Sequence, residues 1–324
     1  MNRSRIWLLA LFMALGLAAG PAQAQAFPAR PVRMIVPFPP GQATDIVARM
    51  LAERLTATWN QTVIVDNRGG GGGVPGTLAG RDAPADGYTL LLGTSGTIGV
   101  NPGIYAKLAY DPLKDFAMVG GVFTVPLMLV AHPSLPHNTV KELVDAAKKA
   151  PGTLNWAFPG TGTSQHLTGE LFKFRAGIDL VGIPYKGSGP AMTDLLGGQV
   201  TLMMDSLASS LPHIRSGKIK AIGMSSSVRV PQLPDVPTIA ESGYPGFEGV
   251  GWGGLVIPIA TPRDIVEKIG GDVRRILLDP AMQARIIERG AIADPRGPAE
   301  FTDFVKAEIL KWGEIAKKAG IKAD

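Results

Sequence analysis

The chain has 324 residues, a formal net charge of +5 and no cysteine. This length is enough for two domains of ordinary size, and without cysteine the protein has neither disulfides nor a lipidated N-terminal cysteine. Lysine and arginine form no dense block and aromatic residues make up only 6%, so the composition gives little support to nucleic-acid binding.

Residues 1–24 have the pattern of a secretory signal peptide. Two arginines precede an apolar run over residues 6–19, and Ala22 and Ala24 form a small-residue cleavage site. The apolar run is about fourteen residues long, too short to span a bilayer comfortably, so a retained membrane anchor is the less favoured alternative. Cleavage removes two positive charges, which leaves +3 of the original +5. We expect the mature protein to be exported to the periplasm without a lipid anchor.

The stretch Val32–Asp45 has the pattern of a strand, a tight loop and a helix. Val32–Val36 contains β-branched residues, as a buried strand should, and the prolines and the glycine of residues 37–41 stop it. Ala43–Leu55 has apolar side chains on one face and predicts an amphipathic helix. A loop that leads into a helix N-terminus presents free N–H groups, which bind anions such as carboxylates. Taken alone, the stretch fits an ordinary strand–helix unit equally well.

A five-glycine loop, residues 69–73, follows a second predicted strand at residues 62–65. Together with Gly76 it matches the G-x-G-x-x-G spacing of dinucleotide-binding loops. However, Pro75 lies inside the turn, and residues 89–99, where the acid that binds the ribose is expected, contain no carboxylate. We therefore interpret the loop as a flexible turn before a helix.

Two further loops rich in Gly, Ser and Thr follow predicted strands. Residues 93–97 follow the strand Thr89–Leu92, and residues 159–166 follow the strand Leu154–Phe158 and open a helix. In open α/β sheets, ligands bind at the loops after the carboxyl ends of strands. Together with the loop at residues 37–45, these two loops are predicted to converge on one cleft.

Strands and helices alternate along the chain, which predicts an α/β fold with two parallel-sheet lobes. A crossover near residue 127 and a return near residue 246 divide the chain. We expect residues 25–127 plus 247–324 to form the first lobe and residues 128–246 the second. The lobes are expected to close on a ligand by a hinge at these two crossings.

Two helices carry clear signals at their ends or on their faces. Thr139 and Glu142 form a capping box for a helix that ends near Ala150. At the C-terminus, Phe301–Lys318 is predicted to be a helix that covers the core with four apolar side chains. These are Phe304, Val305, Leu310 and Trp312.

Six stretches spread over nearly the whole mature chain form a specific set of motifs. They are Arg30–Gly41 with Thr44–Asp45, Val63–Arg68, Pro84–Leu90, Tyr185–Pro190, Asp194–Gln199 and Leu233–Glu241. In these motifs the sequence resembles the periplasmic solute receptors of the tripartite tricarboxylate transporters, also called Bug receptors. The resemblance implies a two-lobed, Venus-flytrap fold of the type II periplasmic binding proteins, with each lobe a mainly parallel sheet flanked by helices.

The resemblance also implies a function. Such a receptor captures a small organic acid, which is a di- or tricarboxylate, a hydroxy acid or an aromatic acid, and presents it to a membrane permease. Main-chain and hydroxyl groups of the strand–helix loops hold the carboxylate, partly through ordered water. The positions that match are Phe38, Gly41, Gln42, Ala43, Thr44, Asp45, Thr94, Ser95, Thr161, Gly162, Thr163, Ser164 and His166, with Asp205 at the cleft edge. Tyr185 is either a further ligand contact or a packed residue at the rim. Asp205 is either a cap at the end of its strand or a ligand contact, and His166 either contacts the ligand or stabilises its loop by a hydrogen bond.

Gln42 departs from the family pattern, which usually has a second glycine at this position. Its amide brings two donors and one acceptor to the mouth of an anion site. Gln42 is therefore either a residue that contributes to ligand specificity or a side chain that points to solvent.

An exported hydrolase is the alternative from a different class. Ser164 and His166 lie two residues apart, and Asp45 or Asp205 would supply a carboxylate. However, the sequence has no G-x-S-x-G nucleophile elbow, and side chains at i and i+2 of a helix start diverge. The four histidines show no metal-ligand spacing. We therefore expect a binding protein without a cofactor or metal, and the sequence leaves the identity of the acid open.

Overall fold

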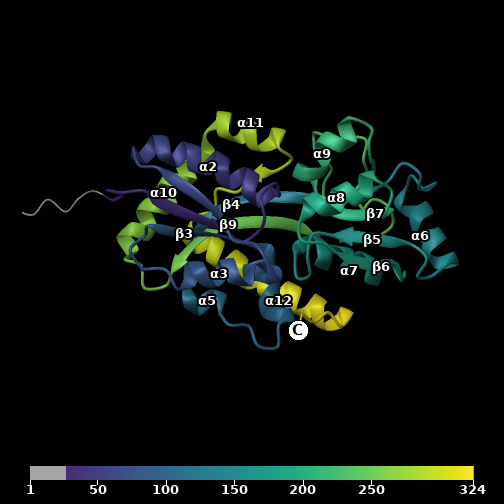
Figure 1. Cartoon of the computed structure of the whole chain (residues 1–324), viewed down its shortest axis with the longest axis horizontal. Helices are drawn as coiled ribbons and strands as arrows, with labels where there is room; N and C mark the ends of the chain where they lie inside the picture. Colours follow the sequence, from purple (N-terminus) through teal and green to yellow (C-terminus); the bar gives the residue numbers. More distant parts are fainter. Residues whose placement is uncertain (1–26, 324) are drawn as a thin grey trace, which may run out of the picture.

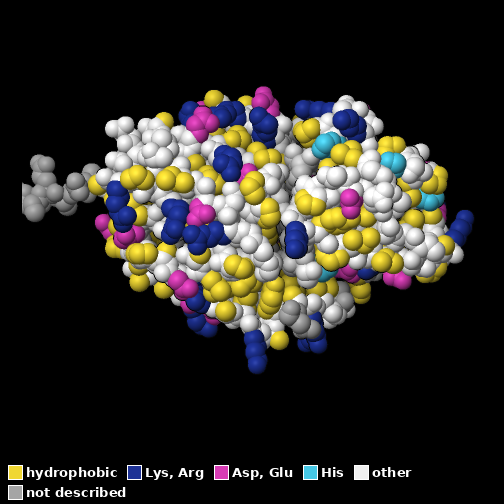
Figure 2. Space-filling model, in the orientation of Figure 1, with side chains coloured by type: hydrophobic (Ala, Val, Ile, Leu, Met, Phe, Trp, Pro, Cys, Tyr) yellow, Lys and Arg dark blue, Asp and Glu magenta, His cyan; other side chains and the backbone are white. Residues whose placement is uncertain are grey.

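The computed structural model describes residues 27–323. The signal-peptide prediction for residues 1–24 therefore lies outside the described residues. The chain forms an α/β fold with one lobe at each end of its long axis (Figure 1). No helix in the described part of the chain is long and apolar enough to cross a membrane. On the face in Figure 2, Lys and Arg side chains are dispersed among acidic ones.

The first lobe is built on three parallel strands. β1 (Val32–Val36) lies between β2 (Val63–Asn67) and β3 (Thr89–Thr94) and pairs with both in parallel. Every residue of β3 is buried, as expected for a central strand of a covered sheet. The helices of this lobe are α2 (Ala43–Trp59), α3 (Val74–Arg81), α4 (Asn101–Ile104), α5 (Pro112–Asp115), α10 (Arg263–Leu278), α11 (Pro280–Glu288) and α12 (Pro298–Ala319), with short helical turns η1 (Gly71–Gly73) and η2 (Ser95–Val100).

The second lobe repeats this arrangement. β5 (Asn155–Phe158) pairs in parallel with β6 (Val181–Pro184) and β7 (Leu202–Ser206). Its helices are α6 (Val140–Lys149), α7 (Ser164–Ala176), α8 (Ser188–Leu196) and α9 (Leu207–Arg215). As predicted, α6 begins after Thr139, whose hydroxyl accepts a hydrogen bond from Glu142 N at 3.1 Å. The Glu142 carboxylate accepts from Asn138 N, one residue earlier than a strict capping box requires.

Two long antiparallel strands connect the lobes. β4 (Phe116–Ala131) pairs with β9 (Val250–Pro258) as far as Pro126, and from Leu127 on it pairs with β7 and β8 (Lys220–Met224) instead. A short strand, β10 (Ile292–Ala293), also pairs with β4. The fold class is therefore as predicted, although β4 and β9 make the sheet of each lobe mixed. The predicted crossings near residues 127 and 246 lie close to this change of partner, whereas the full lobe boundaries stay a prediction.

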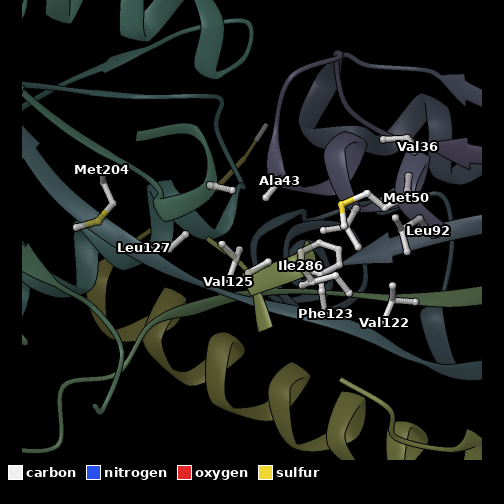
Figure 3. Close-up of a cluster of buried hydrophobic side chains, with 14 of the residues drawn as sticks. Val36, Ala43, Met50, Leu92, Val122, Phe123, Val125, Leu127, Met204 and Ile286 are labelled. Atoms are coloured by element: carbon white, nitrogen blue, oxygen red, sulfur yellow. The ribbon is translucent and has the colours of Figure 1, made fainter. Parts of the chain in front are cut away.

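A buried apolar cluster continues from one lobe into the other along β4. Figure 3 shows Phe123, Val125 and Leu127 of this strand between Leu92 of the first lobe and Met204 of the second. All five side chains are at most 4% exposed. The lobes therefore share packed side chains at the strand that links them.

Helix α12 buries one stripe of side chains. Phe301, Val305, Trp312 and Ala316 are almost fully buried, and Glu308 is 7% exposed. These positions follow one another at intervals of three or four, as one helix face requires. Leu310 lies off this stripe and is 70% exposed, so the prediction that it covers the core is wrong.

Candidate functional site

A small cavity lies between the two lobes. Its volume is about 30 Å³, enough to hold one or two water molecules. Eight of the residues predicted to contact the ligand line it. They are Phe38, Gln42, Ala43, Thr44, Thr94, Ser95, Thr163 and Ser164.

Four helical segments begin at this cavity, two from each lobe. Their N-cap residues are Gln42 for α2, Thr94 for η2, Thr163 for α7 and Ser206 for α9. A helix N-terminus carries unpaired N–H groups and a partial positive charge. Among the described residues, no Lys, Arg or His side chain lines the cavity. An anion in this position would therefore be held by N–H groups, hydroxyls and helix dipoles.

Three of the four N-cap side chains are engaged in capping. The hydroxyls of Thr94, Thr163 and Ser206 each accept a hydrogen bond from the N–H three residues further on, at 3.2–3.3 Å. The Thr163 hydroxyl also donates to Gly160 O at 2.7 Å. These hydroxyls fix the loops and the first helical turns around the cavity.

The next residue in two of these segments is a buried serine. The Ser164 hydroxyl donates to Gln165 Oε1 at 3.1 Å, and the Ser95 hydroxyl accepts from Trp252 N at 3.4 Å. Both serines are less than 8% exposed. Because neither hydroxyl caps its own helix, both retain hydrogen-bonding capacity toward the cavity.

Gln42 differs from the other N-caps. Its side chain makes no capping hydrogen bond and is only 5% exposed. Within residues 27–323, its Nε2 atom has no hydrogen-bond partner. The burial excludes the interpretation that this side chain points to solvent.

Aromatic rings form the apolar part of the wall, with Phe38, Phe123 and Trp252 facing the cavity. The indole of Trp252 is held from behind, since its Nε1 donates to Glu308 of α12 at 2.7 Å. The same carboxylate accepts from Trp312 Nε1 at 2.8 Å. Helix α12 therefore orients one wall of the site.

Asp45 lies behind the wall of the first lobe and does not line the cavity. Its carboxylate accepts hydrogen bonds from Gly41 N and Asn67 Nδ2, both at 3.0 Å, and lies 2.8 Å from Arg49 Nη2. Burial on its own would raise the pKa of Asp45, but the hydrogen bonds and charge of these neighbours leave that pKa below its ordinary value. Asp45 is therefore ionised and orders the loop that precedes α2.

Asp205 is fully buried behind the wall of the second lobe, not at the cleft edge as predicted. Its Oδ1 accepts a hydrogen bond from the Ser188 hydroxyl at 2.7 Å. Burial raises the pKa of Asp205 to about 6, and hydrogen bonds from neighbours offset only part of this rise.

His166 also lies outside the cavity, stacked on Phe158 with ring centroids 4.3 Å apart. Its Nδ1 accepts from Gly162 N at 3.3 Å. Burial lowers the pKa of His166 to about 4, so the ring is neutral at pH 7. No hydrogen bond joins Ser164 to His166 in the described part of the chain. The nucleophile–base pair that the hydrolase alternative requires is therefore not formed.

The remaining predicted residues have other surroundings. Gly41 lines a larger, outer cavity. Thr161 and Gly162 lie where the two lobes meet. A Cβ atom added to Gly72 of the first lobe would lie only 3.3 Å from Thr161 O. The Tyr185 hydroxyl donates to Asp194 at 2.7 Å, as a packed rim residue would. As ligand contacts, these residues stay predictions.

Sequence reasoning did not name seven of the lining residues as ligand contacts, although Gly96 and Gln165 lie in the loops at residues 93–97 and 159–166 that it predicted to converge on the cleft. The seven are Gly96, Phe123, Val125, Gln165, Ser206, Gly251 and Trp252. Four of them come from β4 and β9, whose register sets Phe123 opposite Gly253 across 130 residues of chain. Among the five outside the predicted loops, Ser206 carried a usable signal, because it is a hydroxyl residue at the end of a strand.

Comparisons with known proteins identify the relatives of this chain. Residues 47–321 match the model of the tripartite tricarboxylate transporter family receptor. Protein BugT of Bordetella pertussis is 38% identical over 324 residues, which cover 99% of both chains. The structure of R. palustris Rpa4515 with adipate has a TM-score of 0.89 and 36% identity, covering 91% of this chain and 99% of that one. MatC from Rhodopseudomonas palustris with bound malate has a TM-score of 0.84 and 34% identity, covering 89% and 99%. These matches confirm the resemblance and the fold that the sequence motifs indicated.

Proposed function

Because the chain belongs to the tripartite tricarboxylate transporter receptor family, whose members are periplasmic solute-binding receptors, we propose that it captures a small organic carboxylate between its lobes and delivers it to a membrane permease of that type. The observation that carries this proposal is the meeting of four helix N-termini at one cavity that no cationic side chain lines. Relatives that bind adipate and malate support the carboxylate class. Residues 1–24 direct export and are removed, and no lipid is attached.

In this proposal the carboxylate is held from both lobes. The N–H groups at the start of α2 and η2 approach it from the first lobe, together with the Ser95 hydroxyl. The N–H groups at the start of α7 and the Ser164 hydroxyl approach it from the second. Hydrogen bonds to a charged group are about twice as strong as neutral ones, so a few N–H groups and hydroxyls are sufficient without a salt bridge.

The size of the cavity implies a motion. Its volume of about 30 Å³ holds one or two water molecules, so it accommodates one end of an organic acid and not the whole molecule. The lobes therefore separate to admit the ligand and close around it. β4 and β9 are the strands that connect the lobes, so the hinge lies in them, near the predicted crossings.

A thermal-shift screen of the mature protein against an organic-acid library tests the proposal. A ligand that binds only the folded state stabilises it by RT ln(1 + [L]/Kd), about 2.7 kcal/mol at a hundredfold excess over Kd. We expect at least one carboxylic acid to raise the melting temperature by a few degrees. Sugars and amines of similar size serve as controls. A shift with these compounds and with none of the acids would contradict the proposed function.

A further inference from the structure

The amide of Gln42 is a buried donor that lacks an acceptor. Gln42 precedes the first turn of α2 in the first lobe, is 5% exposed and lines the cavity. No atom of residues 27–323 accepts a hydrogen bond from its Nε2. Buried polar groups in native proteins are nearly always paired, so an unpaired donor in a binding cavity indicates a group supplied by a ligand.

The side chain of Gln42 faces the second lobe at Gly187. A Cβ placed on Gly187 would lie 3.5 Å from Gln42 Nε2. Gly187 is the N-cap of α8, and as a glycine it has no side chain to satisfy the first N–H groups of that helix. In the described part of the chain, no hydrogen bond involves the N–H groups of Ser188 or Gly189. The Ser188 hydroxyl is engaged with Asp205.

Donors from the two lobes thus face each other. In this orientation the Nε2 group of Gln42 and the N–H groups at the start of α8 cannot satisfy one another, because both are donors and the acceptor of the Gln42 amide is its other atom, Oε1. An oxygen atom between them would pair with both at once. The partial positive charge of the nine-residue helix α8 favours an oxygen that carries negative charge.

Space for such a group lies next to this pair. An outer cavity of about 790 Å³ is lined by Gly41, Ser188 and Gly189. Because Gly41 is next to Gln42 in the sequence, the outer cavity begins where Gln42 bounds the inner cavity. It continues between α9 and the end of α11, two helices from opposite lobes (Figure 1). A ligand whose first carboxylate occupies the inner cavity would therefore extend toward Gln42 and α8.

We propose that Gln42 and the N-terminus of α8 form a second subsite, which binds an acceptor oxygen at the far end of the ligand and so determines specificity. The ligand class is a carboxylic acid with a second acceptor, either another carboxylate or a hydroxyl. The inference rests on the proposed function, which supplies the first carboxylate.

Isothermal calorimetry with matched acids tests this subsite. At each chain length from four to six carbons, wild type and Gln42→Leu are titrated with the diacid, the ω-hydroxy acid and the monoacid. Loss of one hydrogen bond to a charged oxygen should weaken diacid binding about 10- to 100-fold. Monoacid binding should change by no more than about twofold. A larger loss for the hydroxy acid than for the diacid would identify the hydroxyl as the natural acceptor.

Two further variants complete the design. Gln42→Asn keeps the amide but retracts it by one methylene group. Its affinity for the diacid should therefore fall less than that of Gln42→Leu. Gln199→Leu removes an exposed amide at the other end of α8 and should change no affinity. An equal loss for all three acids, or no loss in Gln42→Leu, would overturn the subsite. If wild type binds no acid at all, the proposed function fails instead.

Discussion

Asp45 and Asp205, buried carboxylates behind opposite walls of the cavity, have opposite pKa shifts. Asp45 in the first lobe is 4% exposed and Asp205 in the second is fully buried, so burial acts on both in the same direction. Asp45 has Arg49 and two N–H donors beside it, and its pKa is lowered. Burial raises the pKa of Asp205 to about 6, because its neighbours are hydroxyl and amide groups without a cation.

Depth and partners together decide the charge of these two carboxyl groups: Asp205 lies deeper and has no cation beside it, whereas Asp45 lies less deep and has Arg49 as a partner. The wall of the first lobe is supported by an ion pair that persists over the physiological pH range. The wall of the second lobe is supported by a group that gains a proton near pH 6. Two walls that look alike in residue type thus differ in their response to pH.

The largest effect that this comparison predicts is on stability in Asp205→Asn. The folded-state pKa of about 6 exceeds the ordinary value of 3.8, so between these two pH values the folded protein holds a proton on Asp205 that the unfolded chain has released. This contribution to stability is fully present below the unfolded pKa and is lost as the pH rises through 6. At pH 7 we expect Asp205→Asn to be more stable than wild type by on the order of 2–3 kcal/mol. At pH 4 most of the difference should be gone, and below the unfolded pKa of 3.8 it should vanish.

Urea denaturation of both proteins between pH 4 and pH 7 measures this difference. His166 complicates the individual curves, because burial lowers its pKa to about 4 and its contribution is lost as the pH falls. Since both proteins contain His166, its contribution cancels when the two free energies of unfolding are subtracted. A difference that stays constant across this pH range would contradict the raised pKa.

Asp45→Asn should have the opposite sign. The variant leaves Arg49, Gly41 and Asn67 without their charged acceptor, so at pH 7 we expect it to lose about 1–3 kcal/mol of stability. The folded pKa of Asp45 is lowered, so its contribution is present above the unfolded pKa of 3.8 and is lost as the pH falls through the folded value. Denaturation at pH 7 and pH 3 measures both. Asp303→Asn, which removes an exposed carboxylate, is the matched control and should change stability by less than about 0.5 kcal/mol.

The sequence predicted those parts of the fold that depend on local signals. Thr139 marked the start of α6 because a cap and its partner lie within one helical turn. Leu310 was misassigned because apolar character alone does not set the rotation of a helix. In α12 that rotation is fixed by Glu308, which accepts hydrogen bonds from two tryptophan indoles and cannot turn outward.

The same distinction applies to the site. The loops at Gln42, Thr94 and Thr163 were predictable, since each follows a strand and opens a helix. Trp252 and Phe123 were not, because only the long-range pairing of β4 with β9 brings them to the cavity. The burial of Asp205 and the absence of a cation beside it likewise depend on tertiary packing, which no local pattern encodes.

The smallest predicted effects extend the comparison to the N-caps of the two lobes. Thr163 caps α7 with its hydroxyl, whereas Gln42 makes no capping hydrogen bond to α2. We expect Thr163→Ala to lose about 1 kcal/mol of stability, as cap removal typically does. Gln42→Leu, which keeps most of the buried volume and removes the unpaired amide, should lose no stability, because no hydrogen bond to the helix is lost. Chemical denaturation of the two variants without ligand measures this contrast. Equal losses would mean that Gln42 stabilises α2 after all, and its buried amide would then need no ligand to explain it.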